Sequence, residues 1–372
     1  MTEWRDCKFG EIATFSYGKM PNKKNIVNCG YPIFSGYKIV GYYNSYMYED
    51  PQLIIVARGV GGTGDVKISP PKSYITNLSI IAEVHPGKAN KKFLYYYFKI
   101  NNLRELDSGS AQSQITINDL NNYCITLPPL PEQKAIAEVL SSLDDKIDLL
   151  TRQNKTLEDI AQAYFRKWFI EEARDEWITG RLGDLCEVIT KGTTPTTIKK
   201  NFVNNGINFL KVESISDSGA FLEDKFMHID EETHNLLKRS QLKENDVLCS
   251  IAGTIGRIAR VSKEILPANV NQALAIIRAK KYFRFIYYLL KSDIFQNEIH
   301  SRIVESVQAN LSLSEISSIE IAIPEELINK FELFVAPIDD KVQNNKNQIR
   351  ILSKLRDTLL PKLISGEIRI KM

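Results

Sequence analysis

A seven-residue repeat of apolar residues, which begins just after the motif Leu127–Gln133 (LPPLPEQ), constrains this chain more than any other feature. A repeat sustained over several turns predicts a long α-helix that keeps one side against a second helix. Pro131 suits the first helical position, and Glu132 is favourable beside the positive helix N-terminus. The expected helix runs from Pro131 to Phe169, about 58 Å at ~1.5 Å per residue. It is too long to lie buried inside one ordinary domain, so we interpret it as a strut between domains.

A second copy of this pattern lies near the C-terminus, where the fragment Leu143–Ile147 (LDDKI) recurs as Ile338–Val342 (IDDKV). We expect the two helices to form an antiparallel pair; the alternative is that each helix packs separately on its own domain. If they pair about their midpoints, Asn154 faces Asn345, and a buried Asn pair would fix their register. The residues predicted to form the seam are Ile136, Leu140, Leu143, Ile147, Leu150, Asn154, Leu157 and Tyr164 of the first helix, with Ile338, Val342, Asn345, Ile349, Leu352 and Leu359 of the second.

The segments that precede the two helices are also similar to each other. Trp4 followed by FGEI recurs as Trp177 followed by LGDL. Later landmarks recur at a nearly constant offset of 194 to 196 residues, as in Asn77 and Asn271, SAQSQITINDL and SVQANLSLSEI, and ITLP and IAIP. Such self-similarity indicates a duplicated architecture whose two globular parts carry different loop insertions.

The repeat predicts four regions: a first globular domain (1–128), a first long helix (129–172), a second globular domain (173–324), and a second long helix with a C-terminal tail (325–372). The charged segment 171–176 (EEARDE) is expected to be an exposed hinge. Short β-type runs separated by glycine turns, such as 53–57, 74–84 and 271–279, precede aromatic helical stretches at 91–103 and 281–295. The predicted fold class is therefore α/β (mixed α+β), with two similar domains and an internal pseudo-twofold repeat.

Composition narrows the class of protein without identifying it. The chain is 43% hydrophobic and 25% charged, as in soluble globular proteins, and its net charge of +3 neither requires nor excludes a nucleic-acid partner. The five cysteines have no metal-ligand spacing, which favours reduced thiols in the cytoplasm over a disulfide framework. No run of apolar residues reaches the ~20 needed to span a membrane, and no signal peptide is evident.

The sequence contains no defensible catalytic constellation. The string Gly59–Gly64 (GVGGTG) fits a dinucleotide-binding pattern, but the residues that follow do not predict a helix, so a tight turn between strands is the better interpretation. The four histidines show no metal-ligand spacing, and we expect no metal site. The aromatic run Tyr95–Phe98 could stack on bases, although core packing is the stronger expectation. These features point to a binding protein.

The whole plan resembles the specificity (S) subunit of type I restriction–modification systems. The residues that carry the resemblance are Leu127–Asp148 (LPPLPEQKAIAEVLSSLDDKID), the Trp177…LGDL start of the second unit, and Leu359–Ile370 (LLPKLISGEIRI). The resemblance implies two target-recognition domains that each read one half of a bipartite, asymmetric DNA sequence. It also implies a coiled coil that sets the gap and docks two methyltransferase (M) subunits. Restriction (R) subunits would join this assembly.

The resemblance further implies a non-catalytic chain without cofactors, with S-adenosylmethionine, ATP and Mg on the partner subunits. The second repeat departs from the family pattern, because it has PEELINKFE where the first has PPLPEQKAI. This leaves open whether the two M-docking surfaces are equivalent. The rival hypotheses are a coiled-coil protein-interaction scaffold without DNA readout and an enzyme with an unrecognised site.

Polar and basic residues of the glycine-bearing loops are the candidate contacts to double-stranded DNA, because Gln can bond adenine and Arg can bond guanine in the major groove. The alternative for each is an ordinary turn or bulge residue. The candidates are Tyr37, Lys38, Arg58, Ser110, Gln112, Gln114, Lys191, Thr193, Arg257, Asn271, Gln308 and Asn310.

Overall fold

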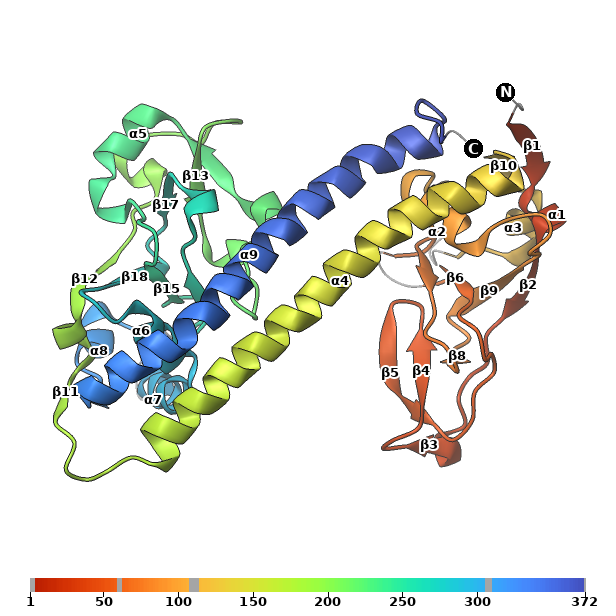
Figure 1. The fold of residues 1–372 in the computed structure, drawn as a ribbon. Coiled ribbons are helices and arrows are strands. Elements are labelled where there is room, and N and C mark those ends of the chain that lie inside the picture. Colours follow the sequence, from red (N-terminus) through yellow and green to blue (C-terminus); the bar gives the residue numbers. More distant parts are fainter. Residues whose placement is uncertain (1–3, 59–61, 107–113, 305–309, 371–372) are drawn as a thin grey trace. The chain divides into compact units, whose positions relative to one another are not determined.

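The structure, a computed structural model, describes residues 4–58, 62–106, 114–304 and 310–370. It divides into two compact units, one formed by residues 1–149 with 349–372 and the other by 150–348. Each unit contains one globular domain and one end of each of two long helices, α4 (Leu130–Arg166) and α9 (Glu325–Ile364) (Figure 1). The described helices are not long and apolar enough to cross a membrane.

The first domain is built mainly from short strands. They are β1 (Arg5–Lys8), β2 (Ala13–Tyr17), β3 (Ile26–Val27), β4 (Tyr31–Ser35), β5 (Lys38–Tyr43), β6 (Leu53–Val56), β7 (Val66–Ile68), β8 (Tyr74–Ile75), β9 (Ser79–Val84) and β10 (Cys124–Leu127). The helices are α1 (Phe9–Ile12), α2 (Lys91–Ile100) and α3 (Ile117–Asn122). One sheet has the order β2-β9-β6-β7 and is antiparallel; a second has the order β3-β5-β4-β8, in which β4 and β8 are parallel.

The second domain repeats this plan. Its strands are β11 (Thr179–Arg181), β12 (Cys186–Lys191), β13 (Ile207–Leu210), β14 (Met227–Ile229), β15 (Val247–Ser250), β16 (Ile258–Arg260), β17 (Ala268–Val270), β18 (Leu274–Ala279) and β19 (Glu320–Ala322). The helices are α5 (Glu231–Leu236), α6 (Phe283–Lys291), α7 (Asp293–Val304) and α8 (Leu313–Ser317). The sheet β12-β18-β15-β16 matches β2-β9-β6-β7 strand for strand, and β13 pairs parallel with β17 as β4 does with β8.

Local hydrogen bonds confirm the predicted repeat. Thr116 and Asp119 form a capping box at the start of α3, and Ser312 and Glu315 form the same box at the start of α8. Each box satisfies backbone N–H groups that the first turn of a helix leaves without partners. The mixed α/β class, the duplicated domains and the pair of long helices predicted from the sequence are all present.

The core of each domain continues onto the long helices. In the first unit the cluster around Phe93 and Leu53 includes Ile136 and Leu140 of α4 and Leu363 of α9. In the second unit the equivalent cluster includes Ala161 and Phe165 of α4 together with Phe331 and Val335 of α9. The apolar faces of the two helices are thus buried against each other and against a domain, which stabilises helices of this length better than propensity alone.

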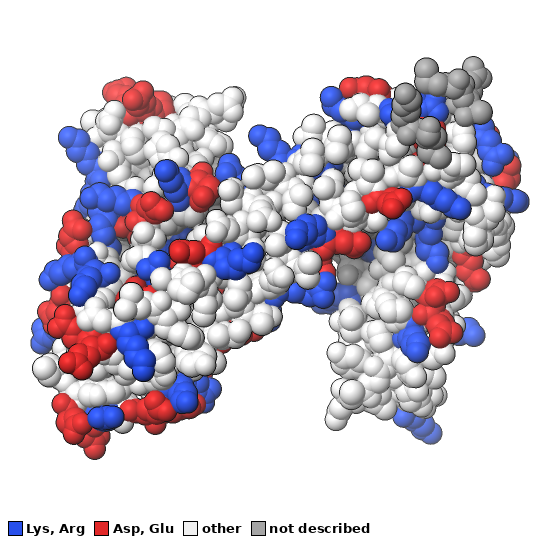
Figure 2. All heavy atoms as spheres, viewed as in Figure 1, with Lys and Arg blue, Asp and Glu red and all other residues white. Residues whose placement is uncertain are grey.

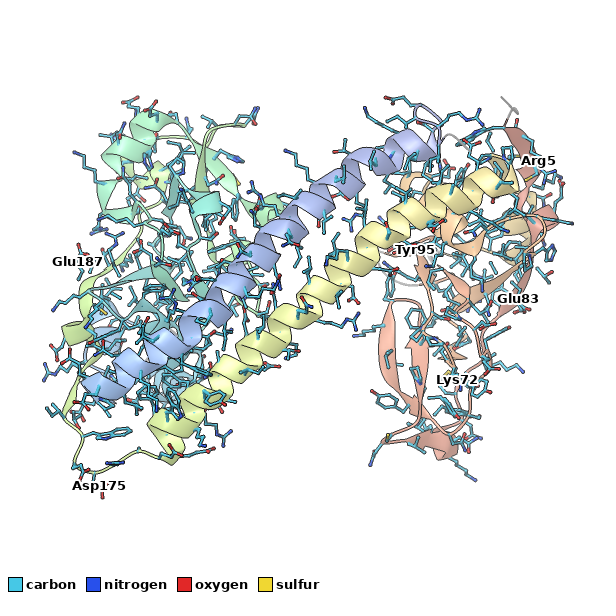
Figure 3. All side chains as sticks on the ribbon, viewed as in Figure 1. Arg5, Lys72, Glu83, Tyr95, Asp175 and Glu187 are labelled. Carbon is cyan, nitrogen blue, oxygen red and sulfur yellow. The ribbon has the colours of Figure 1, made fainter. Side chains whose placement is uncertain are left out.

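Several predicted elements differ in detail from the structure. The run 74–84 forms two strands, β8 and β9, that belong to different sheets, because Thr76–Leu78 turn the chain between them. Helix α4 begins at Leu130, one residue before the prediction, and α4 is followed by a π-helical turn, η3 (Lys167–Glu171). The segment 171–176 is exposed, as predicted for a hinge, and Asp175 of this segment is labelled in Figure 3.

The predicted glycine turn also agrees with the structure where it is described. Strands β6 and β7 pair antiparallel, so the loop leads into a strand and not into a phosphate-binding helix. Residues 59–61 of that loop lie outside the described part. In the aromatic run, Tyr96, Tyr97 and Phe98 are buried, which confirms core packing.

Candidate nucleic-acid interface

The candidate residues of the first domain lie in loops that meet one another. Gly36, with a φ of +62°, turns the chain between β4 and β5 and places Tyr37 and Lys38 at an exposed position. A Cβ added to Gly62 would lie 1.3 Å from the Tyr37 hydroxyl, so the tyrosine ring covers the backbone of the loop between β6 and β7. Arg58 of that loop forms an antiparallel bridge with Gln114. Tyr37 thus lies against the loop that follows β6, and Arg58, at the start of that loop, pairs with Gln114.

Charges beside this surface are balanced within the domain. Asp65, whose carboxylate would repel phosphate, is paired with Arg104 at 3.0 Å. Desolvation and the Asp65 carboxylate raise the pKa of Tyr37, whereas Arg104 lowers it. The phenol therefore remains a hydrogen-bond donor at neutral pH. Ser110 and Gln112 lie outside the described residues.

In the second domain, Lys191, Thr193 and Asn271 come together where β12 ends and β18 begins. A Cβ added to Gly192 would lie 2.5 Å from the carbonyl oxygen of Asn271, so the two segments touch through their backbones. The Arg239 guanidinium donates to the Thr193 hydroxyl at 3.1 Å. Asn271 Oδ1 accepts from the backbone N–H of Ala273 at 3.2 Å, so this side chain also holds its own turn.

Arg257, which was predicted to contact a base, has hydrogen-bond partners inside the second domain. Its Nε donates to Asp217 at 2.9 Å, and its Nη1 donates to the carbonyl oxygens of Val212 and Ile215 at 3.3 and 2.9 Å. Most of its donors are thus engaged inside the domain, so a guanine contact would require an exchange of partners. The sequence offered no signal for this, because Asp217 lies 40 residues away.

Asn310 occupies the position that corresponds to Gln114 in the repeat. It forms an antiparallel bridge with Ala252, as Gln114 does with Arg58. The following backbone bonds also match: Ile115 N donates to Ala57 O at 3.1 Å, and Leu311 N donates to Ile251 O at 3.0 Å. One backbone frame therefore presents Arg58 and Gln114 in the first domain but Ala252 and Asn310 in the second. Gln308 lies outside the described residues.

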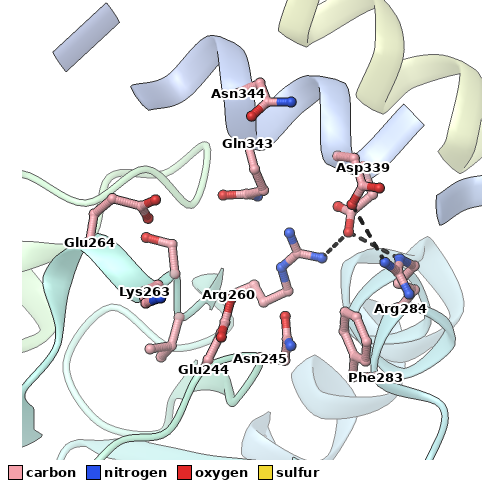
Figure 4. Close-up of a pocket in the computed structure, with 13 residues that line it drawn as sticks. Glu244, Asn245, Arg260, Lys263, Glu264, Phe283, Arg284, Asp339, Gln343 and Asn344 are labelled. Carbon is pink, nitrogen blue, oxygen red and sulfur yellow. Dashed lines mark hydrogen bonds and ion pairs between the residues drawn. The ribbon is translucent and has the colours of Figure 1, made fainter. Parts of the chain in front are cut away.

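A polar cavity of about 360 Å³ lies in the second unit, lined by residues near β16, α6 and α9 (Figure 4). Arg260 and Arg284 converge there on Asp339, and Arg284 Nε lies 3.1 Å from the carboxylate. The guanidinium carbon of Arg284 lies over the Phe283 ring, 4.4 Å from the ring centroid. These contacts join α9 to the domain, so the two guanidinium groups act as structural partners of Asp339.

The motif LPPLPEQ has a structural role that sequence reasoning missed. Glu132 is 4% exposed and accepts two charge-assisted hydrogen bonds from Arg369 in the C-terminal tail, the first from Nε at 2.7 Å. Gln133 accepts from Asn90 N at 2.9 Å and donates to Pro128 O at 2.8 Å. The motif therefore ties the start of α4 to the first domain and to the end of the chain.

The second repeat has an apolar residue at the position that corresponds to Glu132. Counting from Pro128 and Pro324, the position of Glu132 corresponds to Ile328, which is fully buried. At this one position the second repeat has an apolar contact in the core where the first repeat has the Glu132–Arg369 ion pair, while Glu332 of PEELINKFE pairs with Arg284. This difference could not be predicted from the sequence of either repeat alone, because Arg369, the partner of Glu132, lies far away in the chain.

The predicted seam residues are distributed along both helices of each unit. Asn345 Nδ2 donates to Asn154 Oδ1 at 2.9 Å, which confirms the predicted pairing of these two side chains. Ile136, Leu140, Leu150 and Val342 are also buried, whereas Leu143, Ile147, Leu157, Ile338, Ile349, Leu352 and Leu359 are partly buried. Tyr164 is the exception, since it is 39% exposed and lies beside Phe334 with ring centroids 4.5 Å apart.

The position of Tyr164 has a geometric cause. A straight helix has 3.6 residues per turn, so a strict seven-residue row drifts by about 20° per heptad. After four heptads the row that starts at Ile136 has turned toward the edge of the seam, and Phe165 occupies the buried position.

The described residues give little support for a metal site or a reactive thiol. Histidine, cysteine and carboxylate side chains there form no group of three that could hold a metal ion. Burial raises the pKa of the Cys186 and Cys249 thiols to about 12, which disfavours a reactive thiolate at either position.

The fold contains two copies of one domain, each packed on two long helices, and the two copies present different polar side chains on the same backbone frame. The profile of the type I restriction modification DNA specificity domain matches residues 1–159 and 174–359. The chain belongs to this family, that of the type I restriction–modification specificity (S) subunits, and its role is to confer DNA sequence specificity.

Individual relatives agree with this assignment. The chain is 30% identical over 306 residues to the type I restriction enzyme MjaIX specificity subunit of Methanocaldococcus jannaschii, covering 75% of this chain and 69% of that protein. It is 25% identical over 328 residues to the EcoBI specificity subunit of Escherichia coli, covering 77% and 67%. The crystal structure of the S subunit from M. genitalium superposes with a TM-score of 0.70 at 20% identity, covering 99% of this chain and 96% of that chain. The scaffold without DNA readout is not favoured by these relatives.

Proposed function

We propose that each domain reads one half of a bipartite, asymmetric DNA target and that the α4–α9 pair sets the gap between the halves. The observation that carries the proposal is the matched bridge, Arg58–Gln114 in one domain and Ala252–Asn310 in the other. The backbone geometry is the same, but the side chains differ. Two domains of this kind would offer different donors and acceptors to base edges, and so would select different half-sites.

The partners follow from the same proposal. Two M subunits dock on the helices and methylate an adenine in each half-site, and R subunits join through the complex. The S chain itself is non-catalytic, and S-adenosylmethionine, ATP and Mg are bound by the partner subunits. The complex works on cellular DNA in the cytoplasm.

The test is methylome sequencing of a host that carries this chain with its M subunits. A split, asymmetric methylated motif is expected. Replacing residues 1–128 by the corresponding domain of another S subunit should change one half of the motif and leave the other half and the gap unchanged. A continuous palindrome, or a change in both halves, would contradict the proposal.

A further inference from the structure

A lobe of the first domain has an unusual charge distribution. The sequence contains no Asp or Glu between Glu11 and Glu49, but it contains Lys19, Lys23, Lys24 and Lys38. Most of this stretch forms the β3–β5 lobe, which we define as residues 17–48. All four lysines are exposed, and their side chains form no ion pair within the described ranges. Such a surface attracts polyanions, because its positive charge is not neutralised locally.

The same lobe exposes apolar and aromatic side chains in unusual number. The exposed fractions are 73% for Met20, 46% for Ile26, 47% for Ile39, 54% for Val40, 41% for Tyr42 and 40% for Tyr46. In Figure 2 the lower end of this lobe is white and blue, without red. Exposed apolar groups gathered in this way mark an interaction surface on a soluble protein.

A β-bulge contributes to this surface. In the register of β4 with β5, Ile33 faces Gly41 and Phe34 faces Ile39, so Val40 has no opposite residue. A bulge bends the strand and redirects its side chains, and here both Ile39 and Val40 are exposed beside Lys38. A regular strand would direct one of two consecutive side chains toward the opposite face.

We propose that the β3–β5 lobe is the element with which the first domain reads its half-site, a deepening that rests on the proposed function. Ile39, Val40 and Tyr42 contact base edges in a groove, where a thymine methyl group is an apolar partner. Lys23 and Lys24 bind the flanking phosphates. A duplex has both features in one ligand, anionic phosphates beside partly apolar base edges, and this matches the lobe better than an acidic protein surface does.

Where the structure describes it, the second domain has a different distribution of charge. Its related sheet, β14-β13-β17, is accompanied by exposed carboxylates, among them Glu213, Asp217, Glu231 and Glu232. Three of them are paired with basic side chains, Glu232 with Lys200, Glu213 with Lys211 and Asp217 with Arg257. Positive and negative groups thus neutralise each other there, unlike the four lysines of the first domain, so the inference applies to the first domain alone. The two domains therefore present differently charged lobes on the same frame.

The test uses the full chain assembled with its M subunits, after methylome sequencing has identified the motif. Three variants are compared: I39S/V40S, K23Q/K24Q, and the control I100S, whose residue is 44% exposed on the same domain outside the lobe. Dissociation constants are measured over a series of salt concentrations. The ligands are a duplex with both half-sites and a duplex with the first half-site scrambled.

Each variant has a distinct expected result. I39S/V40S should weaken binding to the intact target about tenfold, the cost of one mismatched base pair or more, with an unchanged salt dependence. K23Q/K24Q should reduce the magnitude of the slope of log K against log salt by about 1.8, because two phosphate contacts are lost. On the scrambled duplex, I39S/V40S should have the same dissociation constant as the wild type. The control I100S should have the wild-type dissociation constant on both duplexes.

Other outcomes would overturn the inference. If I39S/V40S and K23Q/K24Q both bind like the wild type, the lobe does not read DNA. If they lose M subunits in size-exclusion chromatography, the lobe is a protein-docking surface. If I39S/V40S melts at a lower temperature than the wild type, its weaker binding could come from a folding defect. K23Q/K24Q alone then tests the inference. Failure of the wild-type complex to methylate a split motif would instead contradict the proposed function, which separates the two results.

Discussion

Single aspartates of the repeated fragment connect the long helices to their surroundings. Asp144 of LDDKI accepts from Arg356 at 2.8 Å, whereas Asp339 of IDDKV accepts from Arg260 and Arg284. The side chains of Asp339 and Arg260 are each only 6% exposed. Equivalent residues in the repeat thus keep one function, but they use partners from different elements.

Removing Asp339 should strongly destabilise the second unit, because two guanidinium groups would lose their shared buried carboxylate. We expect Asp339→Ala to lower the free energy of unfolding by about 3 kcal/mol in urea denaturation. Asp340→Ala is the matched control: its side chain is 72% exposed, and its loss should cost less than about 1 kcal/mol. Equal effects of the two substitutions would show that the buried network contributes little.

The ion pairs that Glu158 of α4 forms with Lys291 and Lys346 should be sensitive to acid. Burial raises its pKa, but Lys346 and Lys291 outweigh burial, so the pKa is lowered overall. A lowered pKa in the folded state means that the stabilisation is present above the unfolded value, near 4.3, and is lost as the pH falls through the folded value. Stability of the wild type should therefore fall more steeply than that of Glu158→Gln between about pH 5 and pH 3. Identical pH profiles in thermal melts would refute this.

At the scale of elements, the helix pair combines an apolar seam with one polar contact. Asn345 is fully buried, and its Nδ2 donates to Asn154, but among the described residues its Oδ1 has no hydrogen-bond partner. An unsatisfied buried oxygen costs free energy, so the pair is not optimal for stability. Such a pair is better explained by specificity of register.

Replacing both asparagines should therefore stabilise the helix pair. We expect Asn154→Leu with Asn345→Leu to raise the free energy of unfolding by about 1–2 kcal/mol, since a buried polar pair becomes apolar. Asn154→Leu alone should be less stable than the double variant, because Asn345 would then lack any partner. Thermal melts of the four proteins in the cycle measure this coupling, and additive effects would argue against a direct interaction.

At the scale of the whole molecule, the chain uses one domain and one helix twice, and each helix contributes to both compact units. The cores of both units contain residues of α4 and α9. A change in helix length must therefore be made in both helices together if both units are to remain intact.

Seven residues inserted after position 149 and seven after position 348 should preserve the helix pairing. Each insertion adds about 10 Å of helix, equivalent to about three base pairs of DNA. Under the proposed function, methylome sequencing should show a gap that is longer by about three base pairs, with both half-sites unchanged. Insertion in one helix alone, the control, should abolish methylation because the seam would be out of register.

Much of this architecture could be predicted from sequence because its signals are local or periodic. The heptad rows predicted both long helices, and their symmetry predicted the Asn154–Asn345 contact. The capping boxes at Thr116 and Ser312 are also local patterns. By contrast, the engagement of Arg257 by Asp217, and of Glu132 by Arg369, joins residues far apart in the chain.

The sequence by itself determined the number of domains, the duplication and the paired helices, because these depend on the period and order of apolar residues. Only the tertiary structure decided which polar side chains are available to a ligand. Arg257 and Glu132 are taken up within the fold, whereas the bulge at Val40 exposes an apolar surface between lysines. Availability depends on burial and on partners brought together by folding, and neither has a fixed spacing along the chain.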